Sequence, residues 1–212
     1  MEINITVHGL DAIIKHLQTG PEAVKKATAR TLNEAADSGR SWAAKEITKT
    51  YNIKQDRVRD RLRVTFKAKI EALYVIISGY GRGLALAWFS ARQRGFKVLR
   101  AGPKDSKERY LARGRGRPGA VTVLVKKGSG RKEVSSKFGQ KPFMQVMPSG
   151  HLGVFERTGK ERLPLKELYG PDIGGILQTK EISAGIIKAV LEKIKENFLR
   201  NLAFYMGRAS RS

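Results

Sequence analysis

Two long amphipathic helical patterns, one near each end of the chain, constrain its fold more than any other feature. After Pro21, small and apolar residues recur every three or four positions to about Lys49, and a second stripe runs from Ile182 to Tyr205. Pro21 suits the first turn of a helix, and Glu22 places a carboxylate at its positive end. Each pattern therefore predicts a long helix that must bury one face.

The residues between the two helical patterns are typical of strands joined by tight turns. Leu62–Phe66 and Ala72–Ser78 are rich in β-branched and aromatic residues. Valines alternate with other residues from Val121 to Val125, and a Gly-Ser-Gly loop separates them from Val134, which favours a hairpin. This order of elements predicts an α+β fold, in which an antiparallel sheet with hairpins packs against the two long helices.

Shorter patterns complete the expected fold. Ile3–Val7 alternates as a strand does, Leu10–Leu17 has helical spacing, and Ile53–Arg61 is typical of a short basic helix. At this length the chain is expected to form a single domain, residues 1–212, that contains a basic hairpin and arm region at residues 92–137.

The chain is strongly basic, and its charge is uneven. It contains 42 Lys+Arg and 19 Asp+Glu, a net charge of +23; the stretch Arg92–Lys137 alone holds 15 Lys+Arg and 3 acidic residues, a net +12. Residues 104–119 contain little apolar material, which predicts a flexible arm unless a partner orders it. Such charge fits a polyanion, either the phosphate backbone of nucleic acid or an acidic protein surface. The candidate contact residues are Arg92, Arg94, Lys97, Arg100, Arg113, Arg115, Arg117, Lys126, Lys127, Arg131 and Lys132.

Contact with the DNA backbone is favoured over the reading of bases. Arg115-Gly-Arg-Pro118 matches the core of the AT-hook, whose arginines enter the minor groove, but four residues inside a Gly- and Arg-rich stretch carry little specificity.

No set of residues in the sequence predicts catalysis, a metal site or a cofactor. His8, His16 and His151 are isolated from one another, and the chain contains no cysteine. Gly79-x-Gly81-x-Gly83 resembles a dinucleotide fingerprint only superficially, because its third glycine is misplaced and no βαβ pattern follows. Acidic pairs such as Glu192 and Glu196 lie among lysines, as on a solvated helix face. We expect no enzymatic activity.

The sequence also predicts that the protein does not enter a membrane. The longest apolar runs, such as Leu84–Phe89, are far shorter than the roughly 20 residues that span a bilayer. The N-terminus lacks the basic and apolar regions of a signal peptide. We expect the chain to be made in a cytoplasm and to leave it only within a larger assembly.

The most distinctive segment of the chain is Gly150–Gly174. It contains the pattern Gly-x-x-Gly-Val-Phe-x-Arg-x-Gly-x-x-Arg-Leu-Pro-Leu-x-x-x-Tyr-Gly-Pro, and on this pattern the chain resembles the prophage minor tail protein Z family of tail-completion proteins in long-tailed bacteriophages. Phe89–Gln93 and the valine hairpin agree with that family in order. The motif residues taken as docking candidates are Gly153, Val154, Phe155, Arg157, Gly159, Arg162, Leu163, Pro164, Tyr169, Gly170 and Pro171.

The resemblance implies a structural virion protein that is assembled in the bacterial host cytoplasm and acts late in tail assembly. It would lie at the head-proximal end of the tail, with the tail terminator, tail tube and head-tail connector as partners and a homo-oligomeric ring as one arrangement. From the charge we infer that the basic stretch lies near the genome end. The alternative is a DNA-binding module, of cellular or prophage origin, that does not select a sequence.

Physically, the motif also predicts local structure. Phe155 followed by Arg157-x-Gly159 is typical of a strand that ends in a turn, and Leu163-Pro164-Leu165 of an edge strand. Tyr169-Gly170-Pro171 is expected to be a turn before a new element. These roles are architectural, and a docking role for the same residues stays open.

Overall fold

The computed structural model describes residues 3–4, 21–80, 83–101, 109–113 and 119–209. The chain forms two compact units. The helix-rich unit draws on Met1–Thr48, Gln55–Gly81 and Ile173–Ser212, and the strand-rich unit on Lys49–Lys54 and Arg82–Asp172. Long helices and small antiparallel sheets make an α+β fold, as predicted.

Helices dominate the helix-rich unit. Its elements are β1 (Ile3–Asn4), α2 (Glu22–Thr50), α3 (Gln55–Arg59), β2 (Leu62–Phe66), β3 (Ile76–Gly79), α4 (Ile173–Leu177) and α5 (Lys180–Ala209). The strands form one antiparallel sheet in the order β1-β3-β2. The predicted helix at Leu10–Leu17 and most of the predicted first strand lie outside the described residues.

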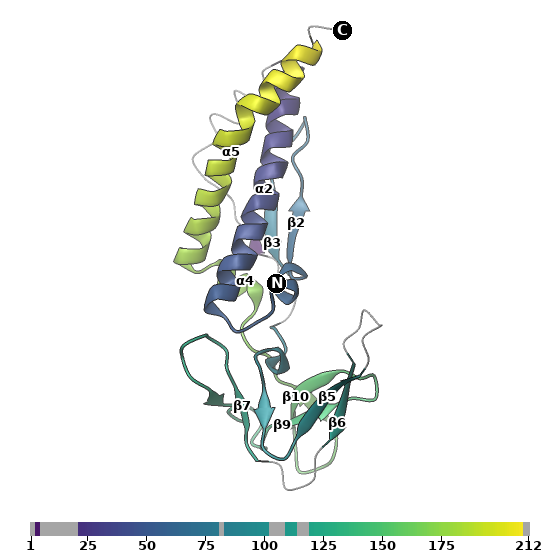
Figure 1. Ribbon diagram of the computed structural model, residues 1–212. Coiled ribbons are helices and arrows are strands. Elements are labelled where there is room, and N and C mark those ends of the chain that lie inside the picture. Colours follow the sequence, from purple (N-terminus) through teal and green to yellow (C-terminus); the bar gives the residue numbers. More distant parts are fainter. Residues whose placement is uncertain (1–2, 5–20, 81–82, 102–108, 114–118, 210–212) are drawn as a thin grey trace. The chain divides into compact units, whose positions relative to one another are not determined.

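Helix α2 lies between α5 and the strands β2 and β3 (Figure 1). It begins as the sequence predicts, because the amides of Val24 and Lys25 donate to the carbonyl of Pro21 at 3.0 and 3.2 Å. Its buried residues are mostly alanines, which let both neighbours approach closely. At Gly185 on α5 the approach is so close that a Cβ atom would overlap the ring of Trp42.

The second half of α5 differs from the predicted apolar stripe. Ile182, Ile186 and Val190 are buried as expected, but the next fully buried positions are Asn197 and Asn201. The predicted stripe residues farther along the helix, Ile194, Phe198 and Leu202, are only half-buried. Both asparagines donate to Glu34 on α2, which explains how a polar pair is accommodated in a helix interface.

Strand β3 begins later than its sequence predicts. Lys69 and Ala72 exchange two backbone hydrogen bonds of 2.9 and 3.1 Å, so the first predicted strand residue, Ala72, closes a turn, and residues 73–75 precede the strand. Tyr74 then stacks on Phe66, with ring centroids 4.4 Å apart.

The strand-rich unit contains three small sheets. Its elements are η1 (Leu86–Trp88), β4 (Arg92–Gln93), β5 (Lys97–Ala101), β6 (Arg109–Arg113), β7 (Val121–Val123), β8 (Lys132–Glu133), β9 (Phe143–Val146), β10 (Leu152–Arg157) and β11 (Leu165–Glu167). The sheet orders are β11-β10-β9, β4-β7-β8 and β5-β6, all antiparallel.

Part of the stretch expected to be an arm is a strand. Arg109–Arg113 forms β6, which pairs with β5 over five residues, because a ladder satisfies backbone groups whatever side chains it carries. Residues 102–108 and 114–118 of the same stretch lie outside the described residues.

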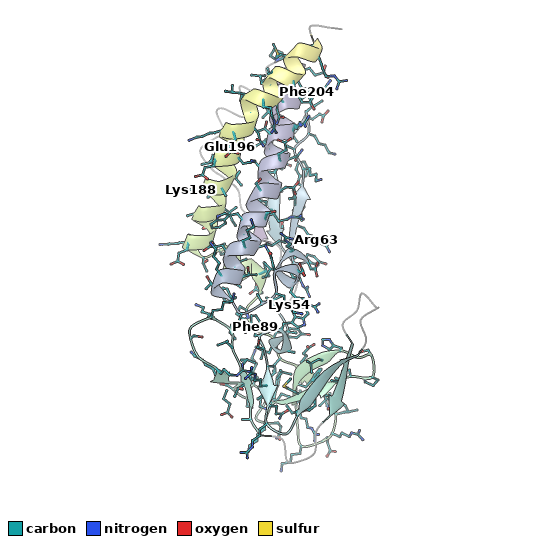
Figure 2. All side chains as sticks on the ribbon, viewed as in Figure 1. Lys54, Arg63, Phe89, Lys188, Glu196 and Phe204 are labelled. Atoms are coloured by element: carbon teal, nitrogen blue, oxygen red, sulfur yellow. The ribbon has the colours of Figure 1, made fainter. Side chains whose placement is uncertain are left out.

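The side chain of Gln93 ties the sheets of the strand-rich unit together. Its Oε1 accepts from the amide of Met144 on β9 at 2.9 Å, and its Nε2 donates to the carbonyl of Gly119 at 2.8 Å. Gln93 is buried, so these bonds are shielded from water. Phe89, which is fully buried in the same unit, is labelled in Figure 2.

Candidate functional site

The first part of the family motif is buried architecture. Gly153, Val154 and Phe155 lie on the central strand β10 with almost no exposed surface. A Cβ atom at Gly153 would lie 2.6 Å from the ring of Phe155 and 2.9 Å from Glu167 Oε1, so a larger residue there would force these side chains to move. These three docking candidates are buried within the folded unit, on the central strand of their sheet.

Sequence reasoning missed the charged residue inside this strand. The carboxylate of Glu156 is completely buried and accepts from Ser136 Oγ at 2.6 Å and from the amides of Lys137, Phe138 and Gln140 at 2.7 to 3.1 Å. Burial opposes ionisation of Glu156, but these hydrogen bonds outweigh it, so its pKa lies below the ordinary value. The carboxylate therefore fixes the loop of residues 136–140 to β10.

The second part of the motif is exposed. Gly159, Arg162, Leu163 and Pro164 lie in the connection between β10 and β11, and Leu163 exposes 67% of its surface. The predicted edge strand is confirmed at β11, which lies at the edge of the sheet β11-β10-β9 but begins only at Leu165. A cis peptide bond joins Leu163 and Pro164. A partner can reach the side chains of this connection.

At the start of that connection, the guanidinium of Arg157 lies over the ring of Phe143, 5.6 Å from its centroid. Arg157 is only half-exposed, so it belongs partly to the architecture of the sheet.

Tyr169-Gly170-Pro171 forms a long-range pairing and not the predicted turn. The Gly170 amide donates to the carbonyl of Leu84 at 2.7 Å, and the Leu84 amide donates to the carbonyl of Pro171 at 3.1 Å. Such pairing between distant segments has no local sequence signal. The next element, α4, begins at Ile173, close to the predicted place.

His151, isolated in the sequence, has a carboxylate partner in the fold. Its Nε2 lies 2.9 Å from Glu167 Oε1, while Tyr169 Oη donates to Glu167 Oε2 at 2.9 Å. His151 and Tyr169 are exposed, Glu167 is half-buried between them, and Tyr169 belongs to the motif itself.

Most of the charge belongs to the strand-rich unit, whose sequence contains 23 Lys+Arg against 7 Asp+Glu, a net +16 of the total +23. The sheet β4-β7-β8 brings Arg92 and Arg131 together, and Lys132 lies on β8. Arg94 follows β4, and Lys126 and Lys127 lie in the connection between β7 and β8; all of these side chains are exposed. The backbones of Lys97, Arg100 and Arg113 lie on β5 and β6, and Arg115 and Arg117 lie outside the described residues.

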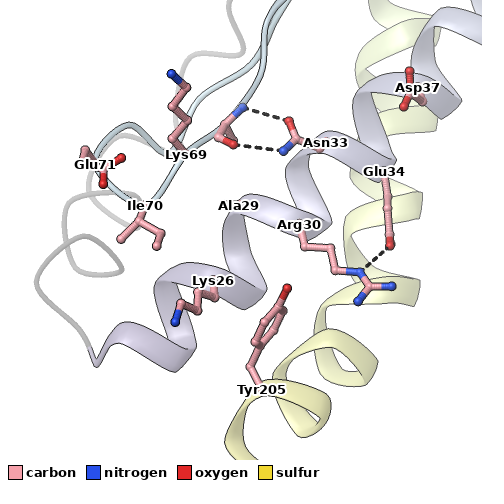
Figure 3. Close-up of a pocket in the computed structure, with 11 residues that line it drawn as sticks. Lys26, Ala29, Arg30, Asn33, Glu34, Asp37, Lys69, Ile70, Glu71 and Tyr205 are labelled. Atoms are coloured by element: carbon pink, nitrogen blue, oxygen red, sulfur yellow. Dashed lines mark hydrogen bonds and ion pairs between the residues drawn. The ribbon is translucent and has the colours of Figure 1, made fainter. Parts of the chain in front are cut away.

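The helix-rich unit contains a pocket of about 610 Å³ beside the first turns of α2 (Figure 3). Asn33 closes part of its wall, because its amide exchanges two hydrogen bonds of 2.8 and 3.0 Å with the backbone of Ala68. Arg30 donates from Nε to Glu34 Oε1 at 3.0 Å. The Arg30–Glu34 pair lies within α2 at i,i+4 spacing, while the Asn33 bonds join α2 to the segment that follows β2.

Neither a metal site nor a membrane-spanning helix is found in the described part of the chain. Within residues 3–4, 21–80, 83–101, 109–113 and 119–209, no group of three or more His, Asp or Glu side chains is arranged to hold a metal ion. Of the helices in those same ranges, none combines the length and apolar character needed to cross a bilayer.

The fold is that of a basic α+β protein with an exposed connection between β10 and β11 and a sheet, β4-β7-β8, whose arginines and lysines are exposed and which we name the cationic sheet. Residues 7–209 match the family model of prophage minor tail protein Z (GPZ), and the chain therefore belongs to that family. Membership supports a structural role in the phage tail and implies contacts with other phage tail proteins. Among curated proteins and among solved structures, none matches the chain.

Proposed function

We propose that this chain is a tail-completion protein without enzymatic activity that acts late in tail assembly, at the head-proximal end of the tail. It docks on the tail terminator or neck and places its basic stretch beside the genome end. Tail-tube and head-tail connector proteins are its further neighbours, and a homo-oligomeric ring is the arrangement that suits a tubular tail.

One observation carries this proposal: the family motif and the basic stretch belong to the same compact unit. Gln93, which lies in the basic stretch, bonds to Met144 on β9, and β9 pairs with the motif strand β10. A partner that holds the exposed β10–β11 connection would therefore also fix the position of the cationic sheet within that unit.

The exposed side chain of Leu163 provides a test of docking. Leu163→Asp places a charge where we expect an apolar contact, and we predict that it lowers the amount of the protein in purified virions at least several-fold. Leu199→Asp is the matched control, because Leu199 on α5 is equally exposed, at 71%. Quantitative mass spectrometry of virions measures both variants. Equal incorporation of the Leu163→Asp chain and the wild type would remove the docking role.

The second candidate function is a DNA-binding module that does not select a sequence, and the net +16 of the strand-rich unit favours it. It predicts tight binding of free duplex DNA, with an affinity that falls steeply as salt rises, and no copies in purified virions. A salt titration with no appreciable binding of the isolated chain would exclude this candidate.

A further inference from the structure

The sheet β4-β7-β8 presents one polar row to solvent. Arg92 pairs with Thr122 across β4 and β7, and Thr122 pairs with Glu133 across β7 and β8. Residues directly opposite in a ladder point to the same face, so these three side chains share one face. Val121 and Val123 point to the other face and are buried, so the row faces solvent.

The guanidinium of Arg131 lies over this row in a fixed orientation. Its Nε donates to Thr122 Oγ1 at 3.3 Å, and its Nη2 donates to the carbonyl of Thr122 at 3.0 Å and to the carbonyl of Ser90. Three acceptors on two segments hold the side chain of Arg131. Most exposed arginines, in contrast, are free to change rotamer. Less side-chain entropy is then lost when Arg131 binds a ligand.

Backbone strain at Ser90 supports this orientation. Ser90 has a φ of 50°, a left-handed conformation that a residue other than glycine adopts at a cost. Asn52 Nδ2 donates to Ser90 Oγ at 2.9 Å and helps to hold the turn, while the Ser90 carbonyl accepts from Arg131. Strain of this kind concentrates at sites where a group must be held in place.

The electrostatics of the row favour an anion. Burial lowers the pKa of Arg131, and the neighbouring charge of Arg92 lowers it further, so two guanidinium groups lie close enough to repel each other. Across the described ranges, neither arginine forms an ion pair with an acidic side chain. Glu133 is the acidic residue of the row, and its charge works against an anion there.

We propose that Arg92 and Arg131 form a clamp that binds one phosphate of the nucleic acid backbone. Guanidinium groups pair with phosphate oxygens through two parallel hydrogen bonds, and Nη1 of Arg131 and the whole guanidinium of Arg92 make no hydrogen bond to a described residue. A nucleic acid fits better than an acidic protein, because a regularly repeated anion can also meet Lys126 and Lys127 in the connection of the same hairpin. The clamp rests on the proposed function, which brings the genome end to this unit.

The test measures the affinity of the full-length chain for short duplex DNA of random sequence as a function of salt. Each lost phosphate contact reduces the slope of log affinity against log salt by about 0.9, which is roughly an eightfold loss near 0.1 M salt. We expect this loss for Arg131→Gln and for Arg92→Gln, and less than the product of the two losses for the double variant, because both arginines hold the same phosphate. Arg92→Gln keeps the assay decisive if Arg131→Gln fails to fold, because the Arg92 guanidinium makes no hydrogen bond to a described residue and the backbone pairing of β4 is kept.

Two further variants sharpen the assay. Glu133→Gln removes the repelling charge and should tighten binding roughly twofold. Lys188→Gln is the charge control, because Lys188 projects from α5 in the other unit (Figure 2), and it should change affinity little. Equal losses for Lys188→Gln and Arg92→Gln would mean a diffuse charge effect and would overturn the clamp.

Binding of polyglutamate by the same variants distinguishes an acidic protein partner from a nucleic acid partner. If polyglutamate binding falls in the arginine variants while DNA binding does not, the surface binds acidic protein and the proposal is wrong.

The location of Arg92→Gln chains in virions separates this proposal from the proposed function. Unchanged DNA binding with the protein at the head-proximal end would overturn the clamp alone, and reduced DNA binding with the protein at the distal tip would overturn the proposed function alone.

Discussion

Gly185 is a residue where α5 packs closely on α2, since a Cβ atom there would overlap the Trp42 ring. We predict that Gly185→Ala lowers the free energy of unfolding by about 1–3 kcal/mol, because the ring must move out of a packed interface. Gly207→Ala on the same helix is the control, since a Cβ atom there would meet no neighbouring group within 4 Å. Urea unfolding measures both, and equal stability of the two variants would contradict this close packing of α5 on α2.

Glu156 makes stability depend on pH. The pKa of Glu156 is lower in the folded chain than its ordinary value of 4.5. Its contribution to the free energy of unfolding is therefore fully present above pH 4.5 and is lost as pH falls through the lower, folded pKa. Glu156→Gln removes the charged acceptor of three amides and should cost about 2–3 kcal/mol at pH 7. Below about pH 4.5, the difference in free energy of unfolding between Glu156→Gln and the wild type should shrink.

The control for this prediction is Glu161→Gln, in the exposed connection between β10 and β11, which removes the same charge and should leave unfolding at pH 7 unchanged. Thermal unfolding measured from pH 7 to pH 3 provides the comparison. A constant difference between Glu156→Gln and the wild type over that range would show that the carboxylate's charge is not what holds the loop.

At the scale of elements, α2 and α5 are joined by a polar cluster as well as by apolar packing. Glu34 Oε2 accepts from Asn197 at 2.9 Å, from Arg200 at 2.9 Å and from Asn201 at 3.2 Å. Asn201 also donates to Thr31 at 3.0 Å. The cluster sets the register of the two antiparallel helices, because a shift by one turn would leave both asparagines buried without a partner.

We predict that Glu34→Leu costs about 2–3 kcal/mol, since it removes the acceptor of two buried amides. The triple variant Glu34→Leu, Asn197→Leu and Asn201→Leu should recover most of that loss, because the orphaned groups are removed as well. Urea unfolding of the single and triple variants measures the difference. A triple variant as unstable as the single one would show that the loss does not come from the unpaired asparagines.

Elements with a strong local pattern were predictable from the sequence, and contacts between distant segments were not. The long helices, β2 and the valine hairpin follow from periodicity and turn residues. Periodicity predicted apolar burial at Ile194 and Phe198, but it could not find Asn197 and Asn201, because their partner Glu34 lies more than 160 residues away. For the same reason, the charge pattern identified Arg92 and Arg131 as candidates without showing that Ser90 orients one of them.

On the scale of the whole molecule, the two units divide the charge unequally. The helix-rich unit has a net charge of +7 and the strand-rich unit +16. The motif connection and the cationic sheet both belong to the more basic unit. This division supports our proposal that one unit meets both the tail partner and the genome end, while α2 and α5 supply a packed scaffold.

The position of the chain in the virion tests the central claim most directly. Cryo-electron microscopy of intact particles, reconstructed without imposed symmetry along the whole tail, would locate its density. Our account predicts density at the head-proximal end of the tail, with the sheet β4-β7-β8 facing the DNA. Density confined to the distal tip or baseplate would contradict it.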